Sequence, residues 1–250
     1  LSGHHTVCDT LRRTNFDPGG FAEYIRLPAI NVDRGVFLLP AEVSYEAATF
    51  IEPLACVLRA QRQAGVKPGS SVLVIGSGIA GLLHVQTARN LGAGMVVATD
   101  ISDYRLEAAL RFGADSTIRA EEDLPGRLRQ ANQGRLADIV IVCTGATSAI
   151  AQSLNSVERG GTILFFAPTA PGVTIPLSIN EILWRNDITL TTSYAGSPAD
   201  YQTALKLIRA GIIPIEQMIT HRLGLAETGT GIQLVADARN SIKVIIETQR

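Results

Sequence analysis

The clearest chemistry in this sequence comes from a glycine-rich turn and an acidic residue about 20 positions further on. The turn is Gly76-Ser77-Gly78-Ile79-Ala80-Gly81 and the acidic residue is Asp100. In this spacing the first glycine permits a tight turn, the second lets the backbone approach a pyrophosphate, and the third lets a helix pack against a strand. The N–H groups at the start of that helix attract phosphates. We therefore predict a dinucleotide site.

Asp100 decides which dinucleotide the sequence favours. At the end of a strand, its carboxylate is expected to accept hydrogen bonds from both ribose hydroxyls of an adenosine. The same negative charge repels a 2′-phosphate, which favours NAD over NADP. Arg105 keeps NADP open, because a nearby arginine is able to hold a 2′-phosphate. In the alternative interpretation, Arg105 covers the adenine or pairs with an acidic neighbour.

Alternating strands and helices around these residues predict an α/β fold with a Rossmann-type, doubly wound parallel sheet. The continuous apolar run 72–75 is typical of a strand buried on both faces. The other strands are predicted at 95–100, 116–118, 138–143, 162–166 and 187–192, with Gly160-Gly161 as a turn. The helices between them are predicted at 79–91, 103–112, 121–130 and 149–157.

The flanking segments are less regular. A turn at Gly19-Gly20 followed by residues 21–28 predicts a strand, and residues 44–50 and 52–64 predict helices. Beyond the sheet, the sequence predicts a helix at 198–210, a strand at 218–223, a helix at 226–238 and a last strand at 242–246.

Composition excludes several classes of partner. The chain has 250 residues, with 46% hydrophobic and 18% charged residues and a net charge of −1. That charge leaves no cationic excess for nucleic acid or a membrane surface. The sequence lacks an apolar run of about 20 residues and has no secretory signal at its start. An odd number of widely spaced cysteines (Cys8, Cys56 and Cys143) favours a cytoplasmic location.

Five short stretches resemble the zinc-dependent medium-chain dehydrogenases, particularly the sorbitol and threonine dehydrogenase branch. They are Gly19-Gly20-Phe21-Ala22-Glu23-Tyr24, Ile51-Glu52-Pro53-Leu54-Ala55-Cys56, Pro68-Gly69, Val142-Cys143-Thr144-Gly145 and Lys243-Val244-Ile245-Ile246. The resemblance implies a Rossmann domain at 52–193, between two parts (1–51 and 194–250) of a GroES-like β-barrel catalytic domain. It also implies a homodimer or homotetramer. The implied reaction is NAD-dependent oxidation of a secondary alcohol, polyol or amino alcohol, with zinc as the Lewis acid.

The resemblance also assigns two zinc ligands. Glu52 matches the glutamate of the catalytic zinc site, and Cys8 matches the last cysteine of a structural zinc lobe. The Gly-His-Glu motif and the remaining cysteines of the family are absent from the sequence. Because the chain does not begin with Met, we expect an N-terminally truncated form that binds NAD but is weakly active or inactive. Without the family, Glu52 is a helix-start residue and Cys8 an ordinary surface cysteine.

Other residues are expected to complete the cofactor site. Thr144 and Gly145 follow the fourth strand and are assigned to the nicotinamide ribose. Phe166 and Ala167 end the next strand and are assigned to the nicotinamide pocket. Lys243 either reaches the pyrophosphate or is solvated, and His84, inside the first helix of the unit, is interpreted as structural.

Two rival functions remain. The first is a non-catalytic dinucleotide-binding or regulatory module. The second, a zinc-free quinone reductase relative, is disfavoured because Glu52-Pro53 and the Cys8 segment follow the zinc branch.

Overall fold

The computed structural model describes residues 5–13 and 16–249. The chain forms two compact units, Leu1–Cys56 with Tyr194–Arg250, and Val57–Ser193. We call these the split unit and the central unit. The start of the chain, where the sequence suggested a truncated zinc lobe, lies partly outside the described residues.

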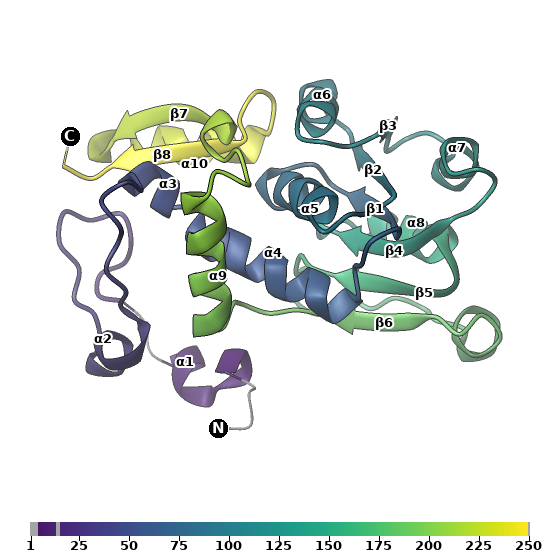
Figure 1. Cartoon of the computed structure of the whole chain (residues 1–250), viewed down its shortest axis with the longest axis horizontal. Helices are drawn as coiled ribbons and strands as arrows, with labels where there is room; N and C mark the ends of the chain where they lie inside the picture. Colours follow the sequence, from purple (N-terminus) through teal and green to yellow (C-terminus); the bar gives the residue numbers. More distant parts are fainter. Residues whose placement is uncertain (1–4, 14–15, 250) are drawn as a thin grey trace. The chain divides into compact units, whose positions relative to one another are not determined.

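The central unit contains one six-stranded sheet in which every neighbouring pair is parallel (Figure 1). The strand order is β3-β2-β1-β4-β5-β6. This order places the reversal of the winding between β1 and β4, the position at which doubly wound sheets bind ligands. The strands are β1 (Ser71–Ile75), β2 (Met95–Asp100), β3 (Ser116–Arg119), β4 (Ala137–Val142), β5 (Val157–Phe165) and β6 (Thr189–Thr192).

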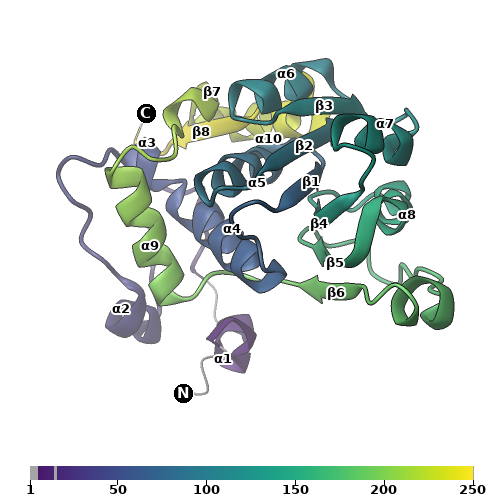
Figure 2. The same cartoon turned by 45° about the vertical axis from the view of Figure 1, so that its right-hand side comes forward.

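Four helices connect successive strands of this sheet. They are α5 (Ile79–Asn90), α6 (Asp103–Arg111), α7 (Leu124–Ala131) and α8 (Thr147–Ser156). Helices α5 and α6 contact each other and β1 to β3, whereas α7 and α8 contact each other and β3 to β5. The two pairs lie on opposite faces of the sheet, as Figure 2 shows. The predicted doubly wound α/β fold is therefore confirmed.

Apolar strands form the core of the central unit. β1 is buried along its whole length, and Leu73, Val97, Val140 and Ile163 from four neighbouring strands belong to one core cluster. At the amino ends of the strands, Asp138 accepts hydrogen bonds from the backbone N and Oγ of Ser71, both at 2.8 Å. These bonds tie β1 to β4 across 67 residues of sequence.

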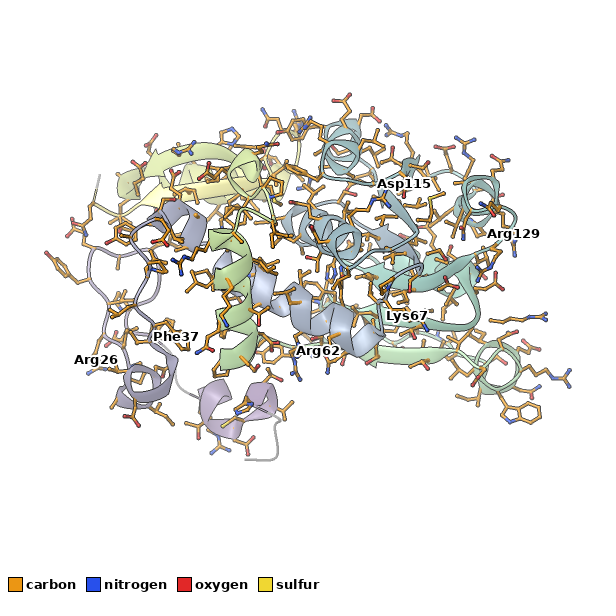
Figure 3. All side chains as sticks on the ribbon, viewed as in Figure 1. Arg26, Phe37, Arg62, Lys67, Asp115 and Arg129 are labelled. Atoms are coloured by element: carbon orange, nitrogen blue, oxygen red, sulfur yellow. The ribbon has the colours of Figure 1, made fainter. Side chains whose placement is uncertain are left out.

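A second acidic residue connects β2 to the start of β3. Asp115, labelled in Figure 3, precedes β3 and accepts a hydrogen bond from the backbone N of Val96 at 2.7 Å. It also pairs with Arg89 at the end of α5. Both ties lie away from the carboxyl ends of the strands.

Most of the regular elements of the split unit are helices. Its two strands, β7 (Ile219–Gly224) and β8 (Lys243–Glu247), pair in parallel, and α10 (Thr228–Asp237) packs against both. Whether these strands belong to a GroES-like barrel stays a prediction. The remaining elements are η1 (His5–Val7), α1 (Asp9–Arg13), α2 (Ala29–Gly35), α3 (Tyr45–Ala48), α9 (Pro198–Arg209), η3 (Glu216–Met218) and η4 (Leu225–Glu227). Helix α4 (Ile51–Ala64) crosses from this unit into the central one.

The strand predicted at 21–28 is wrong. A strand needs a neighbour to bond with, and the described residues give this segment one isolated antiparallel bridge, between Asp17 and Arg26. Apolar side chains of the segment, such as Phe21 and Tyr24, are exposed. Helix α2 follows directly from Pro28 and was not predicted.

Two boundaries in the central unit also differ from prediction. Gly160-Gly161 is not a turn but part of β5, which begins at Val157. The register of β4 and β5 shifts at this point, and an added Cβ on Gly161 would lie 2.8 Å from the carbonyl oxygen of Asp138. Helix α7 begins at Leu124 rather than residue 121, because Asp123 caps it and accepts a hydrogen bond from Gly126 N. A π-helix, η2 (Ile179–Trp184), was missed.

None of the helices in the described part of the chain is long and apolar enough to span a membrane.

Candidate functional site

The glycine-rich turn joins the end of β1 to the start of α5. Gly76 has φ +94°, in the left-handed region that favours glycine. Gly78 occupies the N-cap position, and no side chain caps the helix there. The first N–H groups of α5 are therefore left for an external acceptor, such as a phosphate.

Gly78 and Gly81 face different surroundings. An added Cβ on Gly78 would meet only the guanidinium of Arg105, at 3.9 Å from Nη1. An added Cβ on Gly81 would lie 1.9 Å from the carbonyl oxygen of Gly76, so no side chain fits there. Gly78 thus borders open space over the turn, whereas Gly81 brings α5 close to β1.

Asp100 is bound to this turn through the backbone. Its Oδ2 accepts a hydrogen bond from Ser77 N at 2.7 Å, and its Oδ1 accepts one from Ser102 N at 3.0 Å. The residue is only 6% exposed. Each carboxylate oxygen has a second lone pair, so the oriented carboxylate keeps acceptor capacity for two hydroxyl groups.

Arg105 lies beside the glycine turn rather than in a described ion pair. Its guanidinium lies close to Gly78, and among the described residues its Nε is buried with no hydrogen-bond partner. This position is compatible with both interpretations of Arg105, contact with the adenosine or with a phosphate. The choice between them stays open.

The residues after β4 and β5 meet at the same edge of the sheet. Phe166 N and Ala167 N both donate to the carbonyl oxygen of Val142, at 3.0 and 3.1 Å. An added Cβ on Gly145 would lie 2.6 Å from the carbonyl oxygen of Pro168, so these two segments pack closely.

The same edge carries the glycine turn. An added Cβ on Gly76 would lie 3.4 Å from Cβ of Thr144. The structure therefore brings the predicted pyrophosphate, ribose and nicotinamide residues of the central unit to one edge.

His84 contributes a contact that sequence reasoning missed. It is fully buried, and its ring lies edge-on to the ring of Phe166, with centroids 4.6 Å apart. The side-chain N of Gln61 lies 3.1 Å from Nδ1 of His84 and donates to its carbonyl oxygen at 2.7 Å. Burial lowers the pKa of His84 to about 3, which keeps the ring neutral. A histidine in an otherwise apolar stretch of α5 was the available signal.

The predicted zinc ligand Glu52 belongs to a cluster in the split unit. Its Oε1 accepts a hydrogen bond from the Cys56 thiol at 3.1 Å. Burial first, and then this bond and the charge of Glu52, raise the pKa of Cys56 to about 12. The pKa of Tyr201 is also raised to about 12, mainly by burial and next by Glu52.

Lys243 lies in the same unit, close enough to Glu52 for the charge of that carboxylate to act on it. Its Nζ lies 5.2 Å from the centroid of the Phe50 ring and 3.5 Å from the carbonyl oxygen of Thr49. Burial lowers the pKa of this lysine. Its predicted contact with a pyrophosphate stays a prediction.

Zinc requires more donors than these residues bring together. A structural zinc site takes four donors and a catalytic site three. The described residues contain no group of three or more His, Cys, Asp or Glu side chains able to hold a metal ion. Glu52 is paired with Cys56, and Cys8 is exposed near the start of the chain. The described residues therefore do not fit a complete zinc site.

Comparison with known proteins gives a consistent picture. Residues 80–210 match the family model described as zinc-binding dehydrogenase. The chain is 32% identical to the erythritol/L-threitol dehydrogenase of Mycolicibacterium smegmatis, over 96% of this chain and 64% of that protein. It is 31% identical to the L-threonine 3-dehydrogenase of Bacillus licheniformis, over 98% of this chain and 70% of that protein.

Solved structures agree in fold. An alcohol dehydrogenase from Thermus sp. ATN1 superposes with a TM-score of 0.83 and 29% identity, over 92% of this chain and 66% of that one. A protein described as a zinc-binding dehydrogenase of Sinorhizobium meliloti, bound to NADP, superposes with a TM-score of 0.82 and 28% identity. The match covers 92% of this chain and 66% of that one. The chain spans 53–70% of the length of the curated relatives compared.

Proposed function

The chain belongs to the zinc-binding dehydrogenase family, and from this premise we propose that it binds a nicotinamide dinucleotide at the carboxyl edge of its parallel sheet. The parent activity would be oxidation of a secondary alcohol, polyol or amino alcohol. One observation carries the proposal. The start of α5 has no side-chain cap after the glycine turn, and beside this turn lies Asp100, whose carboxylate is oriented by two backbone N–H groups.

Each part of this edge has a task in the proposal. The N–H groups at the start of α5 hold the pyrophosphate, and Gly78 leaves room for it. Asp100 accepts hydrogen bonds from the adenosine ribose. Thr144 and Gly145 contact the second ribose, while the backbone of Phe166 and Ala167 lines the nicotinamide side. When bound, the nicotinamide supplies the hydride acceptor of the reaction.

We propose NAD as the preferred cofactor. The buried carboxylate of Asp100 would face the 2′-phosphate of NADP at close range and repel it. Arg105 remains the residue that favours the alternative, because its guanidinium lies beside Gly78. A solved relative bound to NADP keeps that alternative in view.

No catalytic step is assigned to zinc in this chain. The described residues lack a three-donor group, although Glu52 stands where the family resemblance implies a ligand. We therefore propose that these 250 residues bind the cofactor and turn over alcohols weakly or not at all. The same observation favours the second candidate, a non-catalytic dinucleotide-binding module. Zinc-dependent oxidation of sorbitol or threonine by the chain would reject both statements.

The experiment is a titration of the 250-residue chain with NADH and with NADPH, followed by nucleotide fluorescence, for the wild type and two variants. Gly78→Ala places a methyl group in the proposed phosphate space, yet it meets only the Arg105 side chain, so folding should be retained. Gly229→Ala is the matched control, because an added Cβ there meets nothing within 4 Å.

The expected result is tighter binding of NADH than NADPH by the wild type. Gly78→Ala should weaken binding at least about tenfold, which is about 1.4 kcal/mol, with an unchanged unfolding midpoint, and Gly229→Ala should bind like the wild type. Binding that Gly78→Ala leaves unaltered would remove the glycine turn from the site. Tighter binding of NADPH would overturn the role given to Asp100.

Assembly and location stay proposals as well. β6 is the last strand of the sheet order, so one of its edges faces no strand of its own sheet, and such an edge is a natural contact between copies. We propose a homodimer or homotetramer in the cytoplasm.

A further inference from the structure

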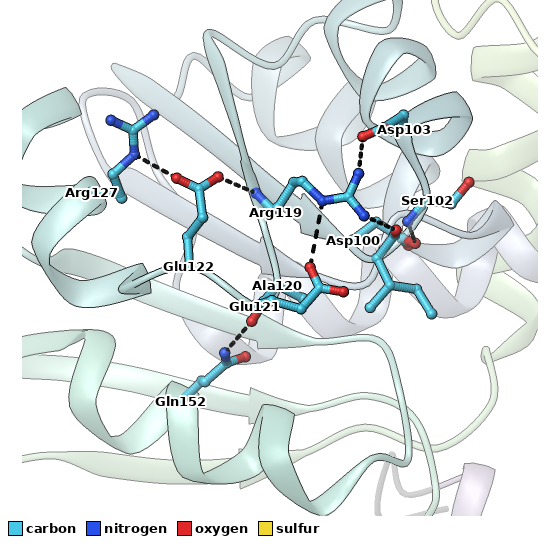
Figure 4. A network of polar contacts seen from close by, with 10 residues as sticks. Asp100, Ser102, Asp103, Arg119, Ala120, Glu121, Glu122, Arg127 and Gln152 are labelled. Atoms are coloured by element: carbon cyan, nitrogen blue, oxygen red, sulfur yellow. Dashed lines mark hydrogen bonds and ion pairs between the residues drawn. The ribbon is translucent and has the colours of Figure 1, made fainter.

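The turn that follows Asp100 is held by an arginine from the neighbouring strand. Arg119, the last residue of β3, stands opposite Asp100 in the parallel register. Its Nη2 donates to the carbonyl oxygen of Ile101 at 2.9 Å, and its Nη1 pairs with the carboxylate of Asp103 (Figure 4). One guanidinium thus contacts both ends of the three-residue segment 101–103.

Arg119 is itself fixed by its surroundings. Its Nε lies 3.6 Å from a carboxylate oxygen of Glu121, and its backbone N donates to Glu122 at 3.2 Å. Glu122 in turn pairs with Arg127 of α7 at 3.0 Å. The next residue, Ala120, donates its N–H to the carbonyl oxygen of Asp100 at 3.1 Å.

A side chain of α8 completes the support. Gln152 donates to the carbonyl oxygen of Ala120 at 2.7 Å, as Figure 4 also shows. Gln152 thus supports the backbone that follows Arg119, whereas the guanidinium itself contacts Ile101, Asp103 and Glu121.

The shape of the 101–103 turn matters for the proposed cofactor site. Ser102 N donates to Oδ1 of Asp100, so the turn sets the direction of that carboxylate. The carbonyl oxygen of Ser102 accepts a hydrogen bond from the backbone N of Arg105 at 3.1 Å. Ser102 is the N-cap residue of α6, so this bond lies in the first turn of the helix. A change in the turn would therefore move both Asp100 and Arg105.

We propose that Arg119 is a positioning residue for cofactor specificity, a role that rests on the proposed function. It holds the 101–103 turn so that Asp100 faces the adenosine ribose and disfavours a 2′-phosphate. Its own guanidinium is engaged by Ile101, Asp103 and Glu121, so it does not serve as a ligand for that phosphate.

The type of side chain matters more than its charge. Arg119 is 43% exposed and Asp103 is 74% exposed, and a single ion pair in such a setting contributes little. A planar guanidinium reaches a carbonyl and two carboxylates in fixed directions, which a lysine ammonium on a flexible stem does not reproduce. Charge alone should therefore restore only part of the effect.

The test compares Arg119→Met, Arg119→Lys and Arg127→Met, with dissociation constants for NADH and NADPH measured on the 250-residue chain. Arg127→Met is the matched control, because it removes an arginine of the same network that contacts Glu122 and not the 101–103 turn. Arg119→Met should weaken NADH about tenfold and NADPH less, so the preference shifts toward NADPH. Arg119→Lys should fall between, and Arg127→Met should keep the wild-type ratio.

Three outcomes would overturn the inference. If NADPH loses more affinity than NADH in Arg119→Met, the guanidinium binds the phosphate directly. If Arg119→Lys restores the wild-type ratio completely, charge rather than geometry is responsible. If Arg119→Met and Arg127→Met give the same ratio as the wild type, Arg119 does not position the site. Failure of the wild type to bind either nucleotide is a separate result, which rejects the proposed function itself.

Discussion

The imidazole of His84 lies edge-on to the ring of Phe166, with the two planes at 87°. This contact joins α5, whose first turn is proposed to hold the pyrophosphate, to the segment proposed to line the nicotinamide. The pKa of the histidine is lowered to about 3 by burial, below the value of about 6.5 expected in the unfolded chain.

The sign of the resulting pH dependence follows from these two values. Between about pH 3 and pH 6.5, His84 is protonated in the unfolded chain and neutral in the folded chain. The free energy of unfolding therefore falls as the pH falls below about 6.5. The slope is about 1.4 kcal/mol per pH unit, so about 2 kcal/mol should be lost by pH 5.

His84→Leu should remove this part of the pH dependence. Gln61 keeps one acceptor in the variant, because it also donates to the backbone carbonyl of residue 84. Urea unfolding at pH 7 and pH 5.5 measures the difference. An equal loss of stability in the wild type and the variant would show that other groups cause the acid sensitivity.

Asp100→Asn should shift the cofactor preference toward NADPH and lower the stability of the fold. The NH2 group of asparagine donates and cannot accept a hydrogen bond, so the one remaining oxygen leaves either Ser77 N or Ser102 N unsatisfied in a buried position. We expect the free energy of unfolding to fall by about 1–3 kcal/mol. NADH binding should weaken more than NADPH binding. The ribose hydroxyls lose an acceptor, whereas the 2′-phosphate of NADPH no longer faces a negative charge.

A matched control for this variant is Asp123→Asn. Asp123 caps α7, and asparagine is an equally good cap. Dinucleotide titrations should therefore give the wild-type values. If Asp100→Asn also bound both nucleotides like the wild type, its carboxylate would have no part in recognition.

Gly81→Ala should destabilise the central unit. The added methyl group would lie 1.9 Å from the carbonyl oxygen of Gly76, and neither backbone can yield without moving α5 from β1. A loss of about 1–3 kcal/mol is expected from such overpacking. Gly229→Ala, inside α10, should instead gain about 0.5–1 kcal/mol. Chemical denaturation distinguishes the two, and an unchanged midpoint for Gly81→Ala would contradict the close packing.

Treatment with a chelator should change neither the unfolding midpoint nor the affinity for NADH. The reason is that the described residues do not assemble three metal-binding side chains. Metal analysis by mass spectrometry before and after dialysis against EDTA makes the comparison quantitative. A stoichiometric zinc ion whose removal lowers the midpoint would contradict this prediction and show that the chain assembles a zinc site.

The central unit was predictable because its signals are local. The glycine turn and Asp100 are 24 positions apart or less, and a buried strand followed by a helix leaves a clear apolar pattern. The contacts of His84 and Arg119 could not be predicted in the same way. They depend on the rotation of α5 and on the register that sets Asp100 opposite Arg119.

The wrong strand at 21–28 has a related cause. Its sequence pattern suits an extended chain, but a strand exists only where a partner supplies the other half of the hydrogen bonds. The turn predicted at Gly160-Gly161 is the opposite case, in which the structure has a strand and the prediction did not. A glycine pair typical of turns here accommodates an irregularity inside β5.

The bonds between Ser71 and Asp138 also bear on the order in which the protein forms during synthesis. The ribosome releases β1 and β2 well before β4. One edge of β1 can therefore pair with β2 early, whereas its other edge has no partner until Asp138, 67 residues after Ser71, has emerged. Closing so long a loop is slow compared with forming a local helix. The β1–α5–β2 portion, with the proposed phosphate cradle, is therefore expected to keep the β4-facing edge of β1 uncovered until β4 has emerged.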